Sequence, residues 1–112
     1  MIKKIRLLLE YNTYCVWLYN ENDEIIDNDN PPEWDDDQEL TSAFMAVSDI
    51  YDTFFVDNEK EFSYIGCDNE ETLEKLRSAV ATAVDVLQKK NNGKYIIVND
   101  IAIPGLNAPH AN

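Results

Sequence analysis

The chain has 112 residues, of which 45% are apolar, and its 22 acidic residues against 9 lysines and arginines give a net charge of −13 at pH 7. This length fits one domain with a single hydrophobic core, and the apolar content excludes wholesale disorder. The negative charge argues against nucleic acid and anionic membranes as partners, because both are polyanions, and no stretch approaches the ~18 apolar residues of a membrane span.

The first third of the chain predicts short strands joined by turns. Residues 3–11 alternate apolar and polar side chains, which is typical of a half-buried strand, and residues 14–19 are rich in β-branched and aromatic residues. The apolar pair at residues 25–26 follows a turn and is expected to form a third strand. Residues 27–37, DNDNPPEWDDD, are predicted to be irregular, because two consecutive prolines interrupt regular structure and Asn and Asp favour turns.

A helix is predicted to follow this loop. Asp36 is the expected N-cap residue, with Glu39 completing a capping box, and apolar residues then recur at helical spacing as far as Val56. Trp17 and Tyr19 share one face of the second strand, either beneath the helices or on an exposed face of the sheet. Aromatic residues on the helical stripe and on the next strand are expected to pack in the core: Phe44, Tyr51, Phe54, Phe62 and Tyr64.

The second half of the chain predicts a strand, a helix and a closing strand. Residues 61–67 are typical of a strand, and Asp68 with Glu71 supplies a capping box for the second helix. This helix is expected to end just before Gly93, because a glycine commonly follows the last helical turn. Residues 95–98 are predicted to form the closing strand.

The order β-β-(β)-α-β-α-β predicts an α+β fold, a mainly antiparallel sheet of four to five strands with two helices packed on one face. We expect one domain over residues 1–103 and a flexible tail over residues 104–112. Cys15 and Cys67 lie among apolar, strand-like residues and do not make the framework of a disulfide-rich secreted protein. The sequence therefore predicts reduced, buried thiols in a cytoplasmic protein.

The negative charge is concentrated in one part of the chain. Between Leu7 and Glu59 the sequence has fifteen Asp and Glu residues and no Lys or Arg, so this acidic segment carries −15 while the remainder sums to +2. Charge of one sign at this density opposes compactness, and it favours solubility and fast association with cationic partners. The sequence therefore predicts a strongly positive partner.

The acidic loop, residues 27–39, is the candidate interface. Its acids also fit a solvated loop and helix N-terminus, where negative charge is favourable. Trp34 among them favours a recognition surface, in which a buried aromatic anchor is surrounded by charges that steer a basic partner. Asp49 and Asp52 fall on the polar side of the first helix, where we expect them to extend the same patch. The predicted partner-binding residues are Asp27, Asp29, Glu33, Trp34, Asp35, Asp36, Asp37, Glu39, Asp49 and Asp52.

The sequence contains no pattern typical of a catalytic or metal-binding site. The acidic loop lacks the glycine and the spaced bidentate Glu of a calcium-binding EF-hand, and pairs of acids are too plentiful to indicate a hydrolase. The single histidine, His110, lies close to the C-terminus, so neither cysteine has an evident histidine base. We therefore predict a protein without enzymatic activity, catalytic residues, metal or cofactor.

Four motifs carry a resemblance to a known class of proteins. They are W-x-Y-[DN]-x-[DN] at residues 17–22, the Pro-containing acidic loop, Y-D-x-F-F at residues 51–55 and E-F-x-Y-x-G at residues 61–66. Together they cover about residues 10 to 67, and this stretch resembles small acidic immunity proteins of bacterial polymorphic and contact-dependent growth-inhibition toxin systems. The resemblance implies tight, stoichiometric inhibition of a cognate toxin domain, commonly a basic nuclease, and it implies no catalytic residues.

Two other functions would use the same negative surface. A nucleic-acid mimic spreads charge along a long face and binds several DNA-binding proteins, whereas an immunity protein adds a shaped hydrophobic anchor and binds one cognate partner. Trp34 within the acidic loop favours the immunity protein. An acidic adaptor without inhibitory activity is the third alternative.

Overall fold

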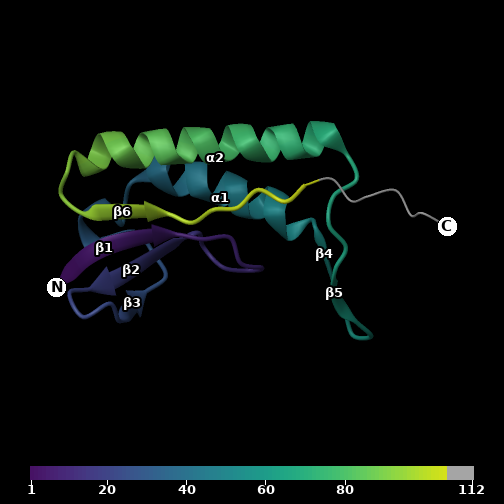
Figure 1. Cartoon of the computed structure of the whole chain (residues 1–112), viewed down its shortest axis with the longest axis horizontal. Coiled ribbons are helices and arrows are strands. Elements are labelled where there is room, and N and C mark those ends of the chain that lie inside the picture. Colours follow the sequence, from purple (N-terminus) through teal and green to yellow (C-terminus); the bar gives the residue numbers. More distant parts are fainter. Residues whose placement is uncertain (106–112) are drawn as a thin grey trace.

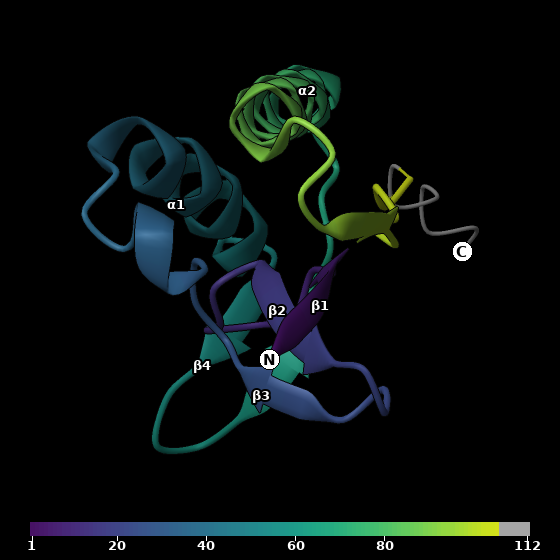
Figure 2. The ribbon, with the colours of Figure 1, turned by 90° about the vertical axis from the view of Figure 1, so that its left-hand side faces the viewer.

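The computed structural model describes residues 1–105 and has an α+β fold (Figure 1). Two helices lie on one face of a four-stranded, mostly antiparallel sheet, as predicted, and a two-stranded hairpin forms a small sheet of its own (Figure 2). Residues 106–112, which include His110 and most of the predicted tail, lie outside the described residues. The elements are β1 (Ile2–Leu7), β2 (Val16–Asn20), β3 (Ile25–Asp27), the 3-10 helix η1 (Pro32–Trp34), α1 (Gln38–Asp52), β4 (Phe55–Asp57), β5 (Phe62–Tyr64), α2 (Glu70–Asn91) and β6 (Ile96–Asn99).

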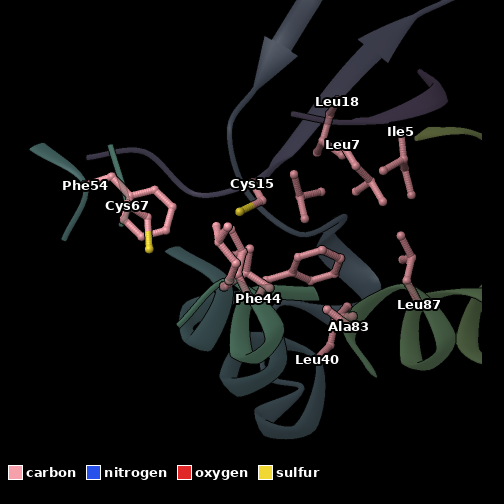
Figure 3. Packing of buried hydrophobic residues seen from close by; sticks show 14 residues of the cluster. Ile5, Leu7, Cys15, Leu18, Leu40, Phe44, Phe54, Cys67, Ala83 and Leu87 are labelled. Carbon is pink, nitrogen blue, oxygen red and sulfur yellow. The ribbon is translucent and has the colours of Figure 1, made fainter. Parts of the chain in front are cut away.

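The main sheet has the strand order β3-β2-β1-β6. Residues 8–15 connect β1 to β2 and a short turn at residues 21–24 connects β2 to β3. Both pairs are antiparallel, whereas β6 follows α2 and pairs with β1 in parallel. In the β1–β2 register, Ile5 lies opposite Leu18 and Leu7 opposite Val16. All four side chains are buried, so this face of the sheet forms one wall of the core (Figure 3).

The opposite face of the sheet carries basic residues of β1. Lys4 lies opposite Tyr19 and Arg6 opposite Trp17, and these positions alternate with the core positions, so all four lie on the face away from the helices. Lys4 Nζ lies 4.7 Å from the centroid of the Tyr19 ring, and Arg6 Nη1 donates a 3.3 Å hydrogen bond to the Tyr19 hydroxyl. Trp17 and Tyr19 therefore lie on the face away from the helices, but they are not exposed there as the second alternative expected, because Tyr19 is buried and Trp17 is partly buried.

The core lies between the inner face of the sheet and the two helices. From α1, Leu40, Phe44 and Val47 are fully buried. Figure 3 shows the side chains of the sheet directed toward Phe44 and toward Leu87 of α2. The buried apolar residues of α2 are Leu73, Leu76, Ala83 and Leu87. The amphipathic faces of both helices are thus buried against one sheet, which is why both helices lie on the same side of it.

Both cysteines are buried free thiols, as predicted. Cys15 is 1% exposed, and its Sγ lies 3.3 Å from Oγ of Ser48 in α1. Burial raises the pKa of Cys15, which keeps the side chain in its less reactive thiol form at neutral pH. Cys67 is buried beside Phe54 and belongs to the same core cluster (Figure 3).

The start of α1 differs from the prediction by one residue. Asp37 is the N-cap residue, and its Oδ1 accepts a 3.0 Å hydrogen bond from Leu40 N. The predicted capping box of Asp36 and Glu39 was therefore wrong. The one-turn helix η1 sets the cap position, because Asp37 N donates a 3.1 Å hydrogen bond to Trp34 O and this fixes how the chain enters α1.

The end of α1 and the strand that follows also differ from the prediction. The helix ends at Asp52, four residues before Val56, because residues 55–57 form β4 and pair with β5. The two strands form a hairpin and are separate from the main sheet. Phe62 is 60% exposed and Tyr64 is 49% exposed, so the expectation that both pack in the core was wrong. The core expectation holds for Phe54, which is buried.

The second helix is capped by an amide in place of the expected carboxylate. Asn69 is the N-cap residue of α2, and its side chain accepts a 3.2 Å hydrogen bond from Thr72 N, so the cap predicted at Asp68 was one residue early. At the other end Asn92 takes the left-handed conformation with φ 43°, and Gly93 follows with φ 83°. Gly93 thus lies just beyond the helix, as predicted, because a glycine tolerates this backbone region.

We expect Phe44→Ala to destabilise the fold by about 3–5 kcal/mol, since it removes a fully buried aromatic side chain and leaves a cavity. The measurement is guanidinium-induced unfolding followed by circular dichroism. The matched control is Met45→Ala, the next residue of α1, which is 45% exposed and should change the unfolding free energy by about 0.5 kcal/mol or less. Equal losses in the two variants would contradict the assignment of the core.

Candidate partner-binding surface

The first part of the acidic loop is ordered by two inward-facing amides. Asn28 Nδ2 donates hydrogen bonds of 2.7 Å to Tyr14 O and 2.9 Å to Val16 O. Asn30, which is 5% exposed, accepts a 2.8 Å hydrogen bond from the Tyr14 hydroxyl and donates to Thr41 Oγ1 at 3.1 Å. Burial raises the pKa of Tyr14 to about 12, so its hydroxyl stays protonated and remains a donor. The DNDN run is therefore an anchored stretch of chain.

The acids that alternate with these amides are exposed. Asp27 and Asp29 are exposed, and together with Asp35 they border one pocket of about 270 Å³. The apolar part of its lining includes Ile2 and Ile26. The structure thus brings these three predicted interface residues together around a shared depression.

Glu33 is engaged within the molecule. Its carboxylate forms an ion pair with Lys94 and accepts 2.8 Å hydrogen bonds from the Tyr95 hydroxyl. Partial burial raises the pKa of Glu33, but the hydrogen bonds from Lys94 and Tyr95 outweigh it and leave the pKa below its ordinary value. Glu33 therefore joins the acidic loop to the chain between α2 and β6.

Asp37 and Glu39 are both neutralised by Lys90 near the end of α2. Lys90 Nζ lies 2.8 Å from Asp37 Oδ2 and 3.1 Å from Glu39 Oε1. The hydrogen bond from Lys90, together with that from Leu40 N, lowers the pKa of Asp37 below its ordinary value. These two acids stabilise the junction of the loop with α1 and α2, so they contribute little free charge to a partner.

Trp34 lies closer to the core than its sequence context indicates. Its side chain is partly buried and packs against the hydrophobic core. The rings of Trp34 and Tyr95 make an edge-to-face contact with centroids 5.8 Å apart and an interplanar angle of 89°. The sequence could not reveal this contact, because the two residues are far apart in the chain. A role for Trp34 as an anchor for a partner stays a prediction.

The structure does not bring Asp49 and Asp52 to the acidic loop. Both lie in the last turns of α1, and the length of this helix places Asp52 ~20 Å from its N-terminus. They border a separate pocket together with Asn12 and Thr13. Asp52 Oδ1 accepts a 3.0 Å hydrogen bond from Asn12 N. The predicted interface acids thus form two groups, one at each end of α1.

Most of the predicted interface acids have no cationic neighbour. Within residues 1–105 the only ones paired with a lysine are Glu33, Asp37 and Glu39. The others have no Lys or Arg nitrogen within 4.0 Å in that part of the chain: they are Asp27, Asp29, Asp35, Asp36, Asp49 and Asp52. Because Asp35 and Asp36 are also exposed, they present unneutralised charge directly to solvent.

Sequence reasoning missed the residues that hold the acidic loop in place. The alternation of Asp and Asn over residues 27–30 was a signal for Asn28 and Asn30, since a period of two places the amides on one side and the acids on the other. Lys90 and Lys94 left no local signal, because they meet the loop only through the tertiary fold. The aromatic hairpin described below was also missed as a candidate site.

Other kinds of site find little support in the described part of the chain. No group of three or more His, Cys, Asp or Glu side chains within residues 1–105 is arranged to hold a metal ion. In the same range, neither helix has an apolar stretch that could cross a bilayer.

Comparisons with protein-family models, curated proteins and solved structures find no match to this chain. The resemblance to immunity proteins therefore stays a prediction.

We expect Lys90→Met to destabilise the fold in a pH-dependent way. In the folded chain the pKa of Asp37 is lowered, and Lys90 is the largest cause. The stability that this ion pair contributes is therefore complete above the unfolded-state pKa of about 4, and it is lost as the pH falls through the lower folded-state pKa. The difference in unfolding free energy between the natural chain and the variant should be positive at pH 7 and should shrink as the pH falls from about 5 to about 2.

Urea titrations at several pH values measure this difference. At low pH, protonation of the other carboxylates reduces self-repulsion in both chains. Taking the difference in unfolding free energy between the two chains at each pH removes this shared effect. Lys89→Met is the matched control, because within residues 1–105 Lys89 pairs only with Asp85, on the exposed surface of the same helix, where such pairs contribute little. If Lys90→Met and Lys89→Met gave the same pH profile, Lys90 would not stabilise the junction.

Proposed function

We propose that the chain is an immunity protein, a cytoplasmic and non-enzymatic inhibitor. It binds one cognate bacterial toxin domain in a tight, stoichiometric complex. The toxin domain is a basic nuclease, and the chain covers its cationic substrate-binding surface or a neighbouring one. No cofactor, metal, nucleic acid or membrane takes part in this function.

The main support is the set of unneutralised carboxylates on an ordered frame. Asp27, Asp29, Asp35 and Asp36 have no lysine or arginine partner within residues 1–105, although the fold pairs their neighbours in the same loop. Exposed charges of one sign accelerate encounter with a partner of the opposite sign. Because the loop is already ordered, less conformational entropy is lost when it binds.

The titration of the paired loop acids argues against acid–base chemistry at the loop. The pKa values of Glu33 and Asp37 lie below their ordinary range, so both side chains remain carboxylates near neutral pH. A general acid needs the opposite shift, toward neutrality. The buried thiol of Cys15 has a raised pKa, which disfavours the nucleophilic thiolate. These shifts favour fixed negative charge over proton transfer or covalent chemistry.

The proposal is tested by capturing partners of the tagged chain at low salt from the bacterium that encodes it, with identification by mass spectrometry. Support requires one stoichiometric partner with a basic toxin domain whose activity is abolished by an equimolar amount of the purified chain. A set of DNA-binding proteins that added salt or DNA releases together would replace the proposal with nucleic-acid mimicry. A single partner whose activity is unaffected would make the chain an adaptor.

Reversing the charges of Asp35 and Asp36 to lysine should slow association with the captured toxin domain. Asp37 is left unchanged because it caps α1. We expect the association rate constant to fall about tenfold or more at low salt. The effect should diminish above ~0.1 M salt, where charges more than ~10 Å apart are screened. Stopped-flow or surface plasmon resonance measurements across a salt series give the rates.

The matched control reverses Glu71 and Asp85 on α2, which changes the net charge by the same amount. Each of these acids makes an exposed ion pair with a lysine four residues away, and such pairs contribute little to stability. If both double variants slowed association equally, total charge alone would set the rate and the acidic loop would not be the interface.

A further inference from the structure

The β4–β5 hairpin has one aromatic face. Its register places Phe55 opposite Tyr64 and Asp57 opposite Phe62, so these four side chains lie on the same side of the two strands. Val56 and Ser63 form the pair between them and lie on the other side. In Figure 1 the hairpin projects from the end of the molecule where α1 ends, away from the main sheet.

Tyr11, from the turn after β1, completes this face. Its ring centroid lies 4.6 Å from that of Phe55 and 5.1 Å from that of Phe62. Phe55 and Phe62 stack with centroids 5.8 Å apart and planes 10° apart, and Tyr64 meets Phe55 edge-on at 5.1 Å. We refer to these four rings, Tyr11, Phe55, Phe62 and Tyr64, as the aromatic surface.

The aromatic surface is incompletely covered by the rest of the chain. Phe62 is 60% exposed and Tyr64 is 49% exposed, which is unusual for aromatic residues that already contact other rings. Adjacent exposed rings on a projecting element are typical of a surface that another molecule covers.

Two carboxylates, Asp57 and Asp52, lie near the Tyr11 ring of this surface. Asp57 Oδ2 accepts a 3.1 Å hydrogen bond from the Tyr11 hydroxyl, and Asp52 lies at the same end of α1. Burial raises the pKa of Tyr51 beside the surface, and the neighbouring Tyr64 and Asp52 raise it further. Lys60 lies in the hairpin turn, outside the strand pairs. The rings are therefore set in a negative field.

We propose that the aromatic surface receives an arginine side chain of a basic partner protein, with the guanidinium stacked on the exposed rings and paired with the neighbouring carboxylates. This inference rests on the proposed function for the positive charge of the partner. Arginine fits this combination best, because its planar cation stacks on aromatic faces and forms bidentate bonds with carboxylates. A second copy of the chain fits poorly, since two molecules of net charge −13 would bring the same acids together.

The test uses the full chain, labelled with nitrogen-15, and two peptide probes, hexa-arginine and hexa-lysine, at low salt. Chemical-shift changes in amide NMR spectra locate and quantify binding. We expect the largest changes at the aromatic surface and adjacent residues. Hexa-arginine should bind more tightly than hexa-lysine, because a planar guanidinium stacks on an aromatic ring and forms bidentate bonds with a carboxylate, whereas an ammonium does neither.

Phe62→Ser should weaken hexa-arginine binding about two- to fivefold, through loss of an exposed cation–π contact, and should weaken hexa-lysine binding less. The matched control is Ile96→Ser, which removes an apolar side chain of similar exposure, 53%, from β6 of the main sheet and should leave both affinities unchanged. Asp57→Asn keeps a hydrogen-bond acceptor for the Tyr11 hydroxyl but removes the negative charge. It should therefore weaken the binding of both peptides and reduce the salt dependence of that binding. Dispersed amide spectra show that each variant is folded.

Three results would overturn the inference. The first is equal affinity for the two peptides, with chemical-shift changes centred on residues 27–37. The second is an affinity for hexa-arginine that Phe62→Ser does not alter. The third is a set of chemical-shift changes that depend on protein concentration without any peptide and that Phe62→Ser abolishes. The last result would assign the surface to a second copy of the chain. Failure to find an inhibited toxin would remove the proposed function but leave the peptide result intact, whereas a captured toxin domain bound equally well by Phe62→Ser would overturn this inference alone.

Discussion

The fold has to accommodate fifteen carboxylates in residues 7–59, a segment without a lysine or arginine of its own. Every cation that neutralises them comes from another part of the chain: Lys4, Lys90 and Lys94 together pair with four of the fifteen. The other eleven have no such pair within residues 1–105. Their repulsion must be balanced by burial of apolar side chains between the sheet and the two helices, which is the main favourable term in folding.

The acidic loop shows how this balance is achieved locally. Its inward side is neutral, with Asn28 and Asn30 bonded to the chain around β2 and α1, and Trp34 packed against Tyr95. Its remaining anchors are charged: Lys90 at the C-terminal end of α2 and Lys94 in the chain just beyond it. Order therefore comes from hydrogen bonds and packing on one side, while the carboxylates on the other side stay in water, where their repulsion is screened. The loop can be both highly charged and fixed in position.

The sequence correctly predicts the α+β class, both helices and the burial of both thiols. These features depend on the local pattern of apolar residues, which the structure places on the core side of each element. The helix caps were each missed by one residue. At both N-termini two adjacent residues are able to cap, Asp36 and Asp37 in one case and Asp68 and Asn69 in the other, and only the path of the incoming chain selects between them. Strand β4 has three residues, too few to show a period of two.

The candidate site was less predictable than the fold. Charge density identified the acidic loop, but the sequence could not show that Glu33, Asp37 and Glu39 are neutralised by lysines from the other end of the chain. Alternation in residues 62–64 correctly places Phe62 and Tyr64 on one face. It does not indicate whether that face meets the core or solvent, because a two-stranded hairpin can pack with either side inward.

The two ends of α1 can contribute to binding in different ways under the proposed function. Asp35 and Asp36 act over distance, so they influence how fast a basic partner arrives. Phe62 and Tyr64 act only in contact, so they influence how long it stays. The two regions lie beyond opposite ends of α1, whose own length is ~20 Å, so a partner that covers both must span more than the length of this helix. For a partner that covers both regions, the rate of association depends on substitutions before α1, and the rate of dissociation depends on substitutions in the hairpin that follows it.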